Sequence, residues 1–263
     1  MHSTIKYIKN KIKSTPEIGI ILGSGLTEFT NRINKAKELK YTNVPGMPTP
    51  SVKGHGGSFI FGEMGGKEVV CASGRFHMYE GLSLEKVSLP VKIFNNLGVK
   101  TVIITNSSGC LKRNWEIGSF MIITSAIDFT FRDGSDDPLP INITGNKFDE
   151  LMKLAHFSSG QLGIHLNEGC YVWTPGPTYE THAEVKKIDS LNGGAVGMST
   201  LPEIRAAIEC GMSVLGIACL TNYAAGIQKS PLTHQEVVDK AGKSAKSLSD
   251  IIERIINNCN MQI

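Results

Sequence analysis

The stretch Ile18-Gly19-Ile20-Ile21-Leu22-Gly23-Ser24-Gly25 joins a short apolar, β-branched run to a glycine turn. The run predicts a buried strand, and the apolar spacing from Leu26 to Ile33 predicts a helix directly after it. Strand, turn and helix in this order are typical of α/β proteins. The backbone N–H groups of the turn and the Ser24 hydroxyl are suited to hold an anion, although a tight turn with a helix cap explains them equally well.

Similar apolar runs recur along the chain, separated by stretches with helical spacing. We expect strands at residues 68–72, 101–105, 120–123 and 213–219, and helices at residues 84–97, 183–191, 201–210 and 234–258. Near-continuous apolar strands that alternate with helices predict a mixed, mostly parallel sheet covered by helices on both faces. The sequence contains no repeat, low-complexity tract or linker. We therefore expect one α/β domain over residues 1–263, with an N-terminal helix within residues 1–16.

The composition excludes several classes of protein. A chain with 41% hydrophobic and 19% charged residues is typical of a globular protein, not of a disordered chain or a membrane bundle. The formal net charge of +3 is too small for a dedicated nucleic-acid binder. The six cysteines lie far apart without a Cys-x-x-Cys pair, which favours a reduced chain. We expect a cytoplasmic protein that has no signal peptide. We expect neither a membrane nor a nucleic acid as its partner.

Polar side chains gather just after the predicted strands, where open α/β sheets bind their ligands. Arg75, His77 and Tyr79 alternate, so in an extended chain they project to one side. A guanidinium fork with an imidazole suits a phosphate, and Tyr79 can contact a neighbouring sugar. A solvated strand end is an equally good interpretation. His55 lies in the glycine-rich stretch 54–57, which permits close backbone approach to a ligand but also fits an exposed loop.

Further groups suit a heterocycle or a sugar. Tyr179 can stack on a planar ring while Glu180 accepts one of its N–H groups, whereas the alternative makes Glu180 a cap of the next helix. Asn222 follows the strongest apolar strand and offers a donor and an acceptor, unless it is a turn asparagine. Met198 can form a ligand wall or fill the core. His234 can touch a hydroxyl where a capping box also explains the sequence.

The sequence lacks the motifs of several other kinds of enzyme. The sequence contains no Gly-x-Ser-x-Gly nucleophile motif and no His-Glu-x-x-His zinc motif. The triplet His182-Ala183-Glu184 is not followed by the Pro-Cys-x-x-Cys that a zinc deaminase requires. We therefore expect no metal site.

Taken together, these segments resemble the trimeric purine nucleoside phosphorylases. They occur in family order from about residue 18 to the C-terminus. The matching segments are Ile21-Leu22-Gly23-Ser24-Gly25-Leu26, Gly54-His55-Gly56-Gly57, Gly74-Arg75-Phe76-His77-Met78-Tyr79-Glu80-Gly81, Thr105-Asn106, Gly176-Pro177-Thr178-Tyr179-Glu180-Thr181, Val196-Gly197-Met198-Ser199-Thr200 and Thr221-Asn222.

The resemblance implies an enzyme of purine salvage, a pentosyltransferase on one α/β domain that assembles as a homotrimer. It implies reversible phosphorolysis of inosine or guanosine, or of their deoxy forms, to a free purine and (deoxy)ribose 1-phosphate. No cofactor is implied, because inorganic phosphate is the co-substrate. Negative charge develops on the departing purine, and donors on the base stabilise it.

The resemblance also implies a role for each matching residue. Phosphate would be held by Ser24, His55, Arg75, His77, the backbone at Ser107, and Ser199. The sugar would contact Tyr79, Met198 and His234, and the base would contact Tyr179, Glu180 and Asn222. The catalytic residues would be Glu180, Asn222 and His77, with Asn222 donating toward N7 and Glu180 accepting from the N1 side of a 6-oxopurine.

Two alternatives stay open. The sister methylthioadenosine phosphorylases carry aspartate where Asn222 stands, so the asparagine favours inosine and guanosine. The stretch Ile127-Asp128-Phe129-Thr130 nevertheless leans toward that branch, which keeps a methylthioadenosine or adenosine phosphorylase as the first alternative. The altered segment 128–157 motivates the second, a non-catalytic purine-binding protein on the same fold.

Overall fold

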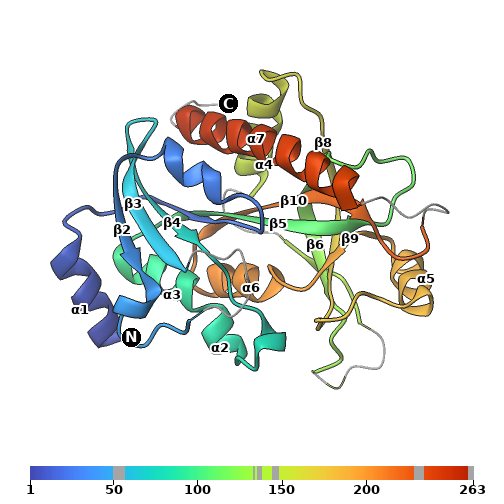
Figure 1. Ribbon diagram of the computed structural model, residues 1–263, viewed down its shortest axis with the longest axis horizontal. Helices are drawn as coiled ribbons and strands as arrows, with labels where there is room; N and C mark the ends of the chain where they lie inside the picture. The colour runs from blue at the N-terminus through green and yellow to red at the C-terminus, as the bar shows by residue number, and fades with distance from the viewer. Residues whose placement is uncertain (50–56, 133, 135–137, 144–147, 228–233, 260–263) are drawn as a thin grey trace.

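The computed structural model describes residues 1–49, 57–132, 134, 138–143, 148–227 and 234–259, except for the side chains of residues 234–243 (Figure 1). The strands are β1 Ile18–Ile21, β2 Asn34–Lys40, β3 Ser58–Met64, β4 Lys67–Ser73, β5 Thr101–Cys110, β6 Phe120–Asp128, β7 Ile141–Asn142, β8 Leu166–Trp173, β9 Gly193–Gly197 and β10 Ser213–Tyr223. The α-helices are α1 His2–Lys11, α2 Leu84–Val87, α3 Leu89–Leu97, α4 Phe148–Gly160, α5 His182–Ser190, α6 Leu201–Glu209 and α7 His234–Asn258. Short 3₁₀ turns occupy Thr27–Arg32, Tyr41–Asn43 and Met78–Glu80.

The strands form one mixed sheet, as expected. Parallel pairing joins β4, β1, β5 and β10 through its centre, and β2 and β3 extend it with antiparallel pairs. On the other side β10 pairs with β6, β6 with β8, β8 with β9, and β9 returns to β5. The five strands β5, β10, β6, β8 and β9 therefore close on themselves. Closure of this kind pairs strand edges that would otherwise stay open.

Helices cover both faces of the central strands, as Figure 1 shows. Helices α4 and α7 pack on one face against β10 and against each other, and α2, α3 and α6 lie on the opposite face. All four residues of β1 are buried, and so are seven consecutive residues of β10 from Val214 to Leu220. A strand covered on both faces reads as a continuous apolar run, which is why the sequence revealed these strands.

Two predicted helices are built differently from expectation. The stretch after the first glycine turn is a 3₁₀ turn, Thr27–Arg32, and not an α-helix. Leu26 and Phe29 are buried three positions apart, a spacing that matches three residues per turn. The helix expected at residues 84–97 is divided into α2 and α3 at Ser88, because Pro90 lies in the first turn of α3 and has no N–H to continue α2.

Strands β4, β5, β6 and β10 are longer than the apolar runs that predict them, and several strands were not predicted. Strand β5 runs to Cys110 and β10 to Tyr223, so both carry polar residues at their carboxyl ends. Strand β2 is mostly exposed and rich in lysine, and so lacks an apolar run. Strands β3 and β8 also escaped prediction as separate elements. The predicted C-terminal helix matches α7.

Candidate active site

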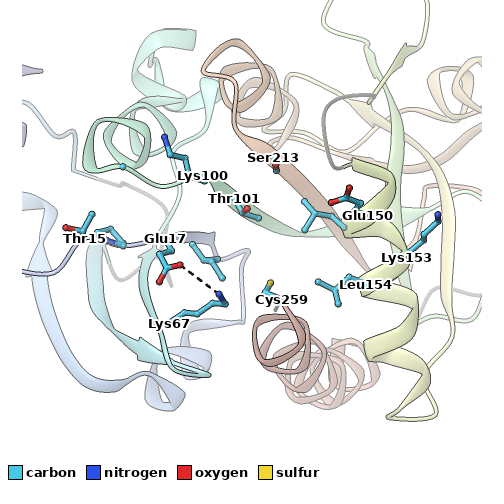
Figure 2. A pocket seen from close by; sticks show the side chains of 14 residues that line it. Thr15, Glu17, Lys67, Lys100, Thr101, Glu150, Lys153, Leu154, Ser213 and Cys259 are labelled. Carbon is cyan, nitrogen blue, oxygen red and sulfur yellow. Dashed lines mark ion pairs between the residues drawn. The ribbon is translucent and has the colours of Figure 1, made fainter. Parts of the chain in front are cut away.

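Two cavities of similar size lie at opposite ends of the central strands. The first, of about 490 Å³, is lined by Ile18, Thr101 and Ser213, the first residues of β1, β5 and β10 (Figure 2). Its ion pair joins Lys67 Nζ to Glu17 Oε2 across 3.9 Å (Figure 2). Open α/β sheets bind their ligands beyond the carboxyl ends of the strands, so we place the candidate site in the second cavity.

The second cavity, of about 480 Å³, lies beyond the carboxyl ends of these strands and is within the size range of small-molecule sites. It collects ten of the twelve residues singled out in the sequence. These are Ser24, Arg75, His77, Tyr79, Ser107, Tyr179, Glu180, Met198, Ser199 and Asn222. His55 lies outside the described residues, as does the side chain of His234. Residues as far apart in the sequence as Ser24 and Asn222 thus line one cavity.

The glycine turn after β1 is clamped to β5. Thr105 Oγ1 accepts the Gly23 N–H at 3.0 Å and donates to Ile21 O at 3.0 Å. A Cβ on Gly23 would lie 2.7 Å from the Asn106 Cα, so this close approach requires glycine. The clamp places Ser24 beside Ser107, whose hydroxyl donates to Ser24 O at 3.2 Å. The two serines therefore reach the cavity together.

Arg75 is the buried cation of the site. Its Nε donates to Glu203 Oε1 at 3.0 Å and its Nη1 donates to Ser199 Oγ at 3.2 Å. The side chains of Arg75 and Glu203 are 2% and 1% exposed. Burial raises the pKa of the Glu203 carboxyl, and the Arg75 guanidinium opposes that rise. Arg75 and Ser199 both line the cavity. The ion pair with Glu203 therefore fixes the guanidinium at the cavity wall.

Ser199 is held in place by a strained turn at the next residue. The next residue, Thr200, has φ 77°, a conformation that is unfavourable for a β-branched side chain. Asn106 Nδ2 donates to Thr200 Oγ1 at 2.9 Å, and both side chains are buried. Ser199 N in turn donates to the Tyr171 hydroxyl at 3.4 Å. These bonds fix the turn in a conformation that the sequence alone would not favour.

His77 and Tyr79 form a stacked pair. Their ring centroids are 4.7 Å apart with an interplanar angle of 17°. His77 Nδ1 lies 3.3 Å from Glu80 Oε1, which also accepts the His77 backbone N–H at 2.7 Å. The segment turns as a 3₁₀ helix at Met78–Glu80, so it is not the extended chain that the alternation predicts. Both rings line the cavity nonetheless.

Tyr79 and Met198 meet at the turn between β8 and α5. Gly176 has φ 64°, and a Cβ there would lie 2.5 Å from Met198 Sδ and 2.8 Å from the Tyr79 ring. Glycine is therefore required for this turn to pack against the two side chains. Burial raises the pKa of the Tyr79 hydroxyl.

Glu180 is not the cap of helix α5. Thr181 is the N-cap, and its hydroxyl and the Glu184 carboxylate form a capping box. Glu180 Oε1 instead accepts a hydrogen bond from Thr174 Oγ1 at 3.0 Å. Glu180 is half-buried and lines the cavity next to Tyr179, which is 78% exposed. The carboxylate therefore does not cap the helix, and one of its oxygens is bonded to Thr174.

Asn222 lies near the end of β10, where the pairing with β5 shifts register between Leu220 and Asn222. Its Nδ2 donates to Tyr223 O at 2.9 Å, and its Oδ1 accepts from Thr221 Oγ1 at 2.9 Å. A carboxamide carries two N–H donors and an oxygen with two lone pairs, so each group retains capacity for a ligand.

Sequence reasoning missed Glu203 and Thr174, which hold Arg75 and Glu180. Glu203 stands in the apolar helical stretch 201–208. The sequence does not indicate that this carboxylate is buried unless its partner is known. Thr174 directly follows β8, so the rule that polar residues after strands form the site would have found it had the strand been recognised.

The described part of the chain contains no group of three His, Cys, Asp or Glu side chains placed to hold a metal ion. None of the helices, as far as they are described, is both long and apolar enough to cross a membrane. The six cysteines are all free thiols.

Comparison with known proteins gives relatives over almost the whole chain. The Phosphorylase superfamily matches residues 17–257. Purine nucleoside phosphorylase 1 of Geobacillus stearothermophilus is 38% identical over 96% of this chain and 95% of its own, and the Mus musculus purine nucleoside phosphorylase is 35% identical over 97% and 92%. The crystal structure of Schistosoma mansoni purine nucleoside phosphorylase in complex with inosine has a TM-score of 0.86 at 32% identity, covering 100% of this chain and 96% of that one. On this evidence the chain belongs to the phosphorylase superfamily, within the family of the purine nucleoside phosphorylases.

Proposed function

We propose that this protein cleaves 6-oxopurine nucleosides, such as inosine and guanosine, by reversible phosphorolysis. One observation carries the proposal. A single cavity combines a buried guanidinium and hydroxyls suited to phosphate with a carboxylate and a carboxamide suited to a purine. The relatives named above are purine nucleoside phosphorylases, which supports the same reaction here.

The phosphate would lie among residues that follow β1, β4 and β9 and beside Ser107 in the carboxyl-terminal part of β5. Arg75 offers a fixed cation, and Ser24, Ser199, His77 and the Ser107 backbone offer donors around it. His55 is proposed for the same role from the sequence. Phosphate held there is placed to attack the sugar carbon C1′, because Tyr79 and Met198, the proposed sugar contacts, line the same cavity. His234 is a further proposed sugar contact.

The base would lie against Tyr179, Glu180 and Asn222. Glu180 would accept the N1–H of a 6-oxopurine, and Asn222 would donate to N7. An asparagine suits this base because its N–H donates to the purine, whereas a carboxylate there would suit the amino group of adenine.

The reaction breaks the C1′–N9 bond and forms a bond from C1′ to a phosphate oxygen. The purine takes the electron pair of the broken bond, and the sugar becomes positively charged in between. Phosphate stabilises the positive sugar and the Asn222 N–H stabilises the negative purine. Overall, the proton of hydrogenphosphate ends on the free base. These steps proceed on the chain's own residues and phosphate, and we propose no cofactor.

We also propose that the chain works as a homotrimer in the cytoplasm. Large apolar side chains stand exposed between β6 and α4, in keeping with a face that another copy covers: Phe131 is 46%, Leu139 74% and Ile141 44% exposed. The six free thiols agree with a reducing compartment.

The proposed reaction is tested by release of hypoxanthine from inosine with and without inorganic phosphate. We expect turnover only with phosphate, and a loss of about 100-fold or more in kcat/KM for Glu180→Ala and for Asn222→Ala, because each removes a contact to the base where charge develops. Glu150→Ala, in the cavity at the other end of the strands, serves as the control and keeps wild-type rates.

Three results would contradict the proposal. Near-wild-type rates in both Glu180→Ala and Asn222→Ala would show that these residues do not have the assigned roles. A higher kcat/KM for adenosine or methylthioadenosine than for inosine would favour the first alternative. Saturable purine binding without turnover would favour the non-catalytic one.

A further inference from the structure

Thr174 lies behind the carboxylate at the base end of the cavity. It directly follows β8, is 5% exposed, and is not among the residues that line the cavity. Its hydroxyl oxygen is 3.0 Å from Glu180 Oε1 and 3.4 Å from Gly197 O. A hydroxyl has one hydrogen, so it can donate to only one of these oxygens at a time.

The hydrogen of this hydroxyl goes to Glu180. Gly197 O already accepts the Thr174 backbone N–H at 2.9 Å, so it is satisfied without the hydroxyl. The carboxylate is nearer and charged, and a hydrogen bond to a charged acceptor is the stronger one. Glu180 Oε2 accepts no hydrogen bond from any residue that the structure describes. One oxygen of Glu180 is therefore held by the protein while the other remains available.

We propose that Thr174 is a positioning residue that selects for purines with a hydrogen on N1. This proposal rests on the function proposed above. The hydroxyl donates to Oε1 and fixes the plane of the carboxylate, so that Oε2 acts as an acceptor toward the base. A 6-oxopurine presents an N1–H donor to that oxygen, whereas adenine presents an N1 lone pair, which the carboxylate repels. Thr174 thus contributes to discrimination without touching the base.

The test compares Thr174→Val with the wild type. Valine has nearly the same shape as threonine but lacks the hydroxyl, so the change removes the bond and little else. We expect kcat/KM for inosine to fall about tenfold, the size of one hydrogen bond to a charged group. The fall should come mainly from KM for inosine, with KM for phosphate unchanged. The affinity for hypoxanthine, measured by calorimetry, should fall by a similar factor, and that for adenine should stay within about twofold.

Two further variants separate positioning from general damage. Thr174→Ser restores the hydroxyl and should recover most of the inosine and hypoxanthine values. Thr124→Val removes a similar hydroxyl, which donates to Gly169 O at 3.3 Å between β6 and β8 and lies away from the cavity lining. It should leave both purine affinities unchanged.

The proposal is overturned if Thr174→Val lowers hypoxanthine and adenine affinity equally, if it changes neither, or if serine fails to restore binding. Absence of inosine phosphorolysis in the wild type would instead contradict the proposed function. The two base affinities would still test Thr174 in that case, so the two failures are distinguishable.

Discussion

At the scale of single residues, the candidate site depends on oppositely charged side chains that pair with each other in the protein interior. The Arg75–Glu203 pair is almost fully buried, and its partners are 128 positions apart in the sequence. Removing one member of a buried pair leaves the other charge uncompensated, which costs about 3–5 kcal/mol of stability. Phosphate bound beside Arg75 would supply a second negative charge.

We therefore predict that Glu203→Gln is destabilised and becomes unusually dependent on phosphate. Without phosphate the free energy of unfolding should fall by about 3 kcal/mol. Added phosphate should recover more stability in the variant than in the wild type, because the anion takes over the neutralisation of Arg75. Urea unfolding with and without phosphate measures both effects.

The matched control is Glu253→Gln, which removes a half-exposed partner of Arg32 on helix α7. An exposed ion pair of this kind contributes about 1 kcal/mol or less, so this variant should unfold nearly like the wild type at either phosphate concentration. Equal phosphate effects in Glu203→Gln and the wild type would show that Arg75 does not depend on Glu203 in this way.

At the scale of elements, helix α5 is fixed beside Glu180 by its N-terminal cap. Glu184 Oε2 accepts the Thr181 N–H at 2.7 Å and the Thr181 hydroxyl at 2.8 Å. These donors, the backbone N–H first, hold the pKa of the Glu184 carboxyl below its usual 4.5. A depressed pKa means that the cap adds stability above the usual pKa and loses it as the pH falls through the lowered one.

The cap should therefore make a pH-dependent contribution to stability. Glu184→Gln keeps an acceptor but not the charge, so it should be less stable than the wild type at neutral pH. The difference should shrink as the pH falls below 4.5 and the wild-type carboxyl becomes protonated. Urea unfolding over this pH range measures the difference. Glu209→Gln, at the exposed end of α6, is the control, and a gap for Glu184→Gln that does not change with pH would contradict the assignment.

At the scale of the whole molecule, the proposed trimer makes a prediction about the exposed apolar residues between β6 and α4. Sedimentation velocity should show a particle with three times the mass of the chain. Leu139→Lys should shift it toward monomers at low protein concentration, because a charge would be buried in the contact. Leu84→Lys, on helix α2, changes another exposed leucine and should leave the trimer intact. A wild-type monomer at every concentration would contradict the proposal.

More of the candidate site than of the surrounding fold could be predicted from the sequence. Ser24, Arg75, Ser107 and Asn222 each stand just after a run of apolar residues or at its end, and parallel strands bring such positions to one edge of a sheet. Their convergence therefore follows from local sequence and one general rule of topology. Strand β2 could not be predicted in this way, because its side chains face solvent and its pairing with β3 depends on a partner distant in sequence.

The sequence by itself determined the buried strands β1, β4, β5, β6 and β10 and the chemistry of the residues at the carboxyl edge, because apolar periodicity and residue type are local properties. Only the tertiary structure decided how β9 closes the sheet onto β5, that Glu203 neutralises Arg75, and that Thr174 donates to Glu180. Each of these depends on which groups become neighbours once water is excluded. A buried charge or carboxylate takes the partner that the packing brings to it, and the local sequence does not specify that partner.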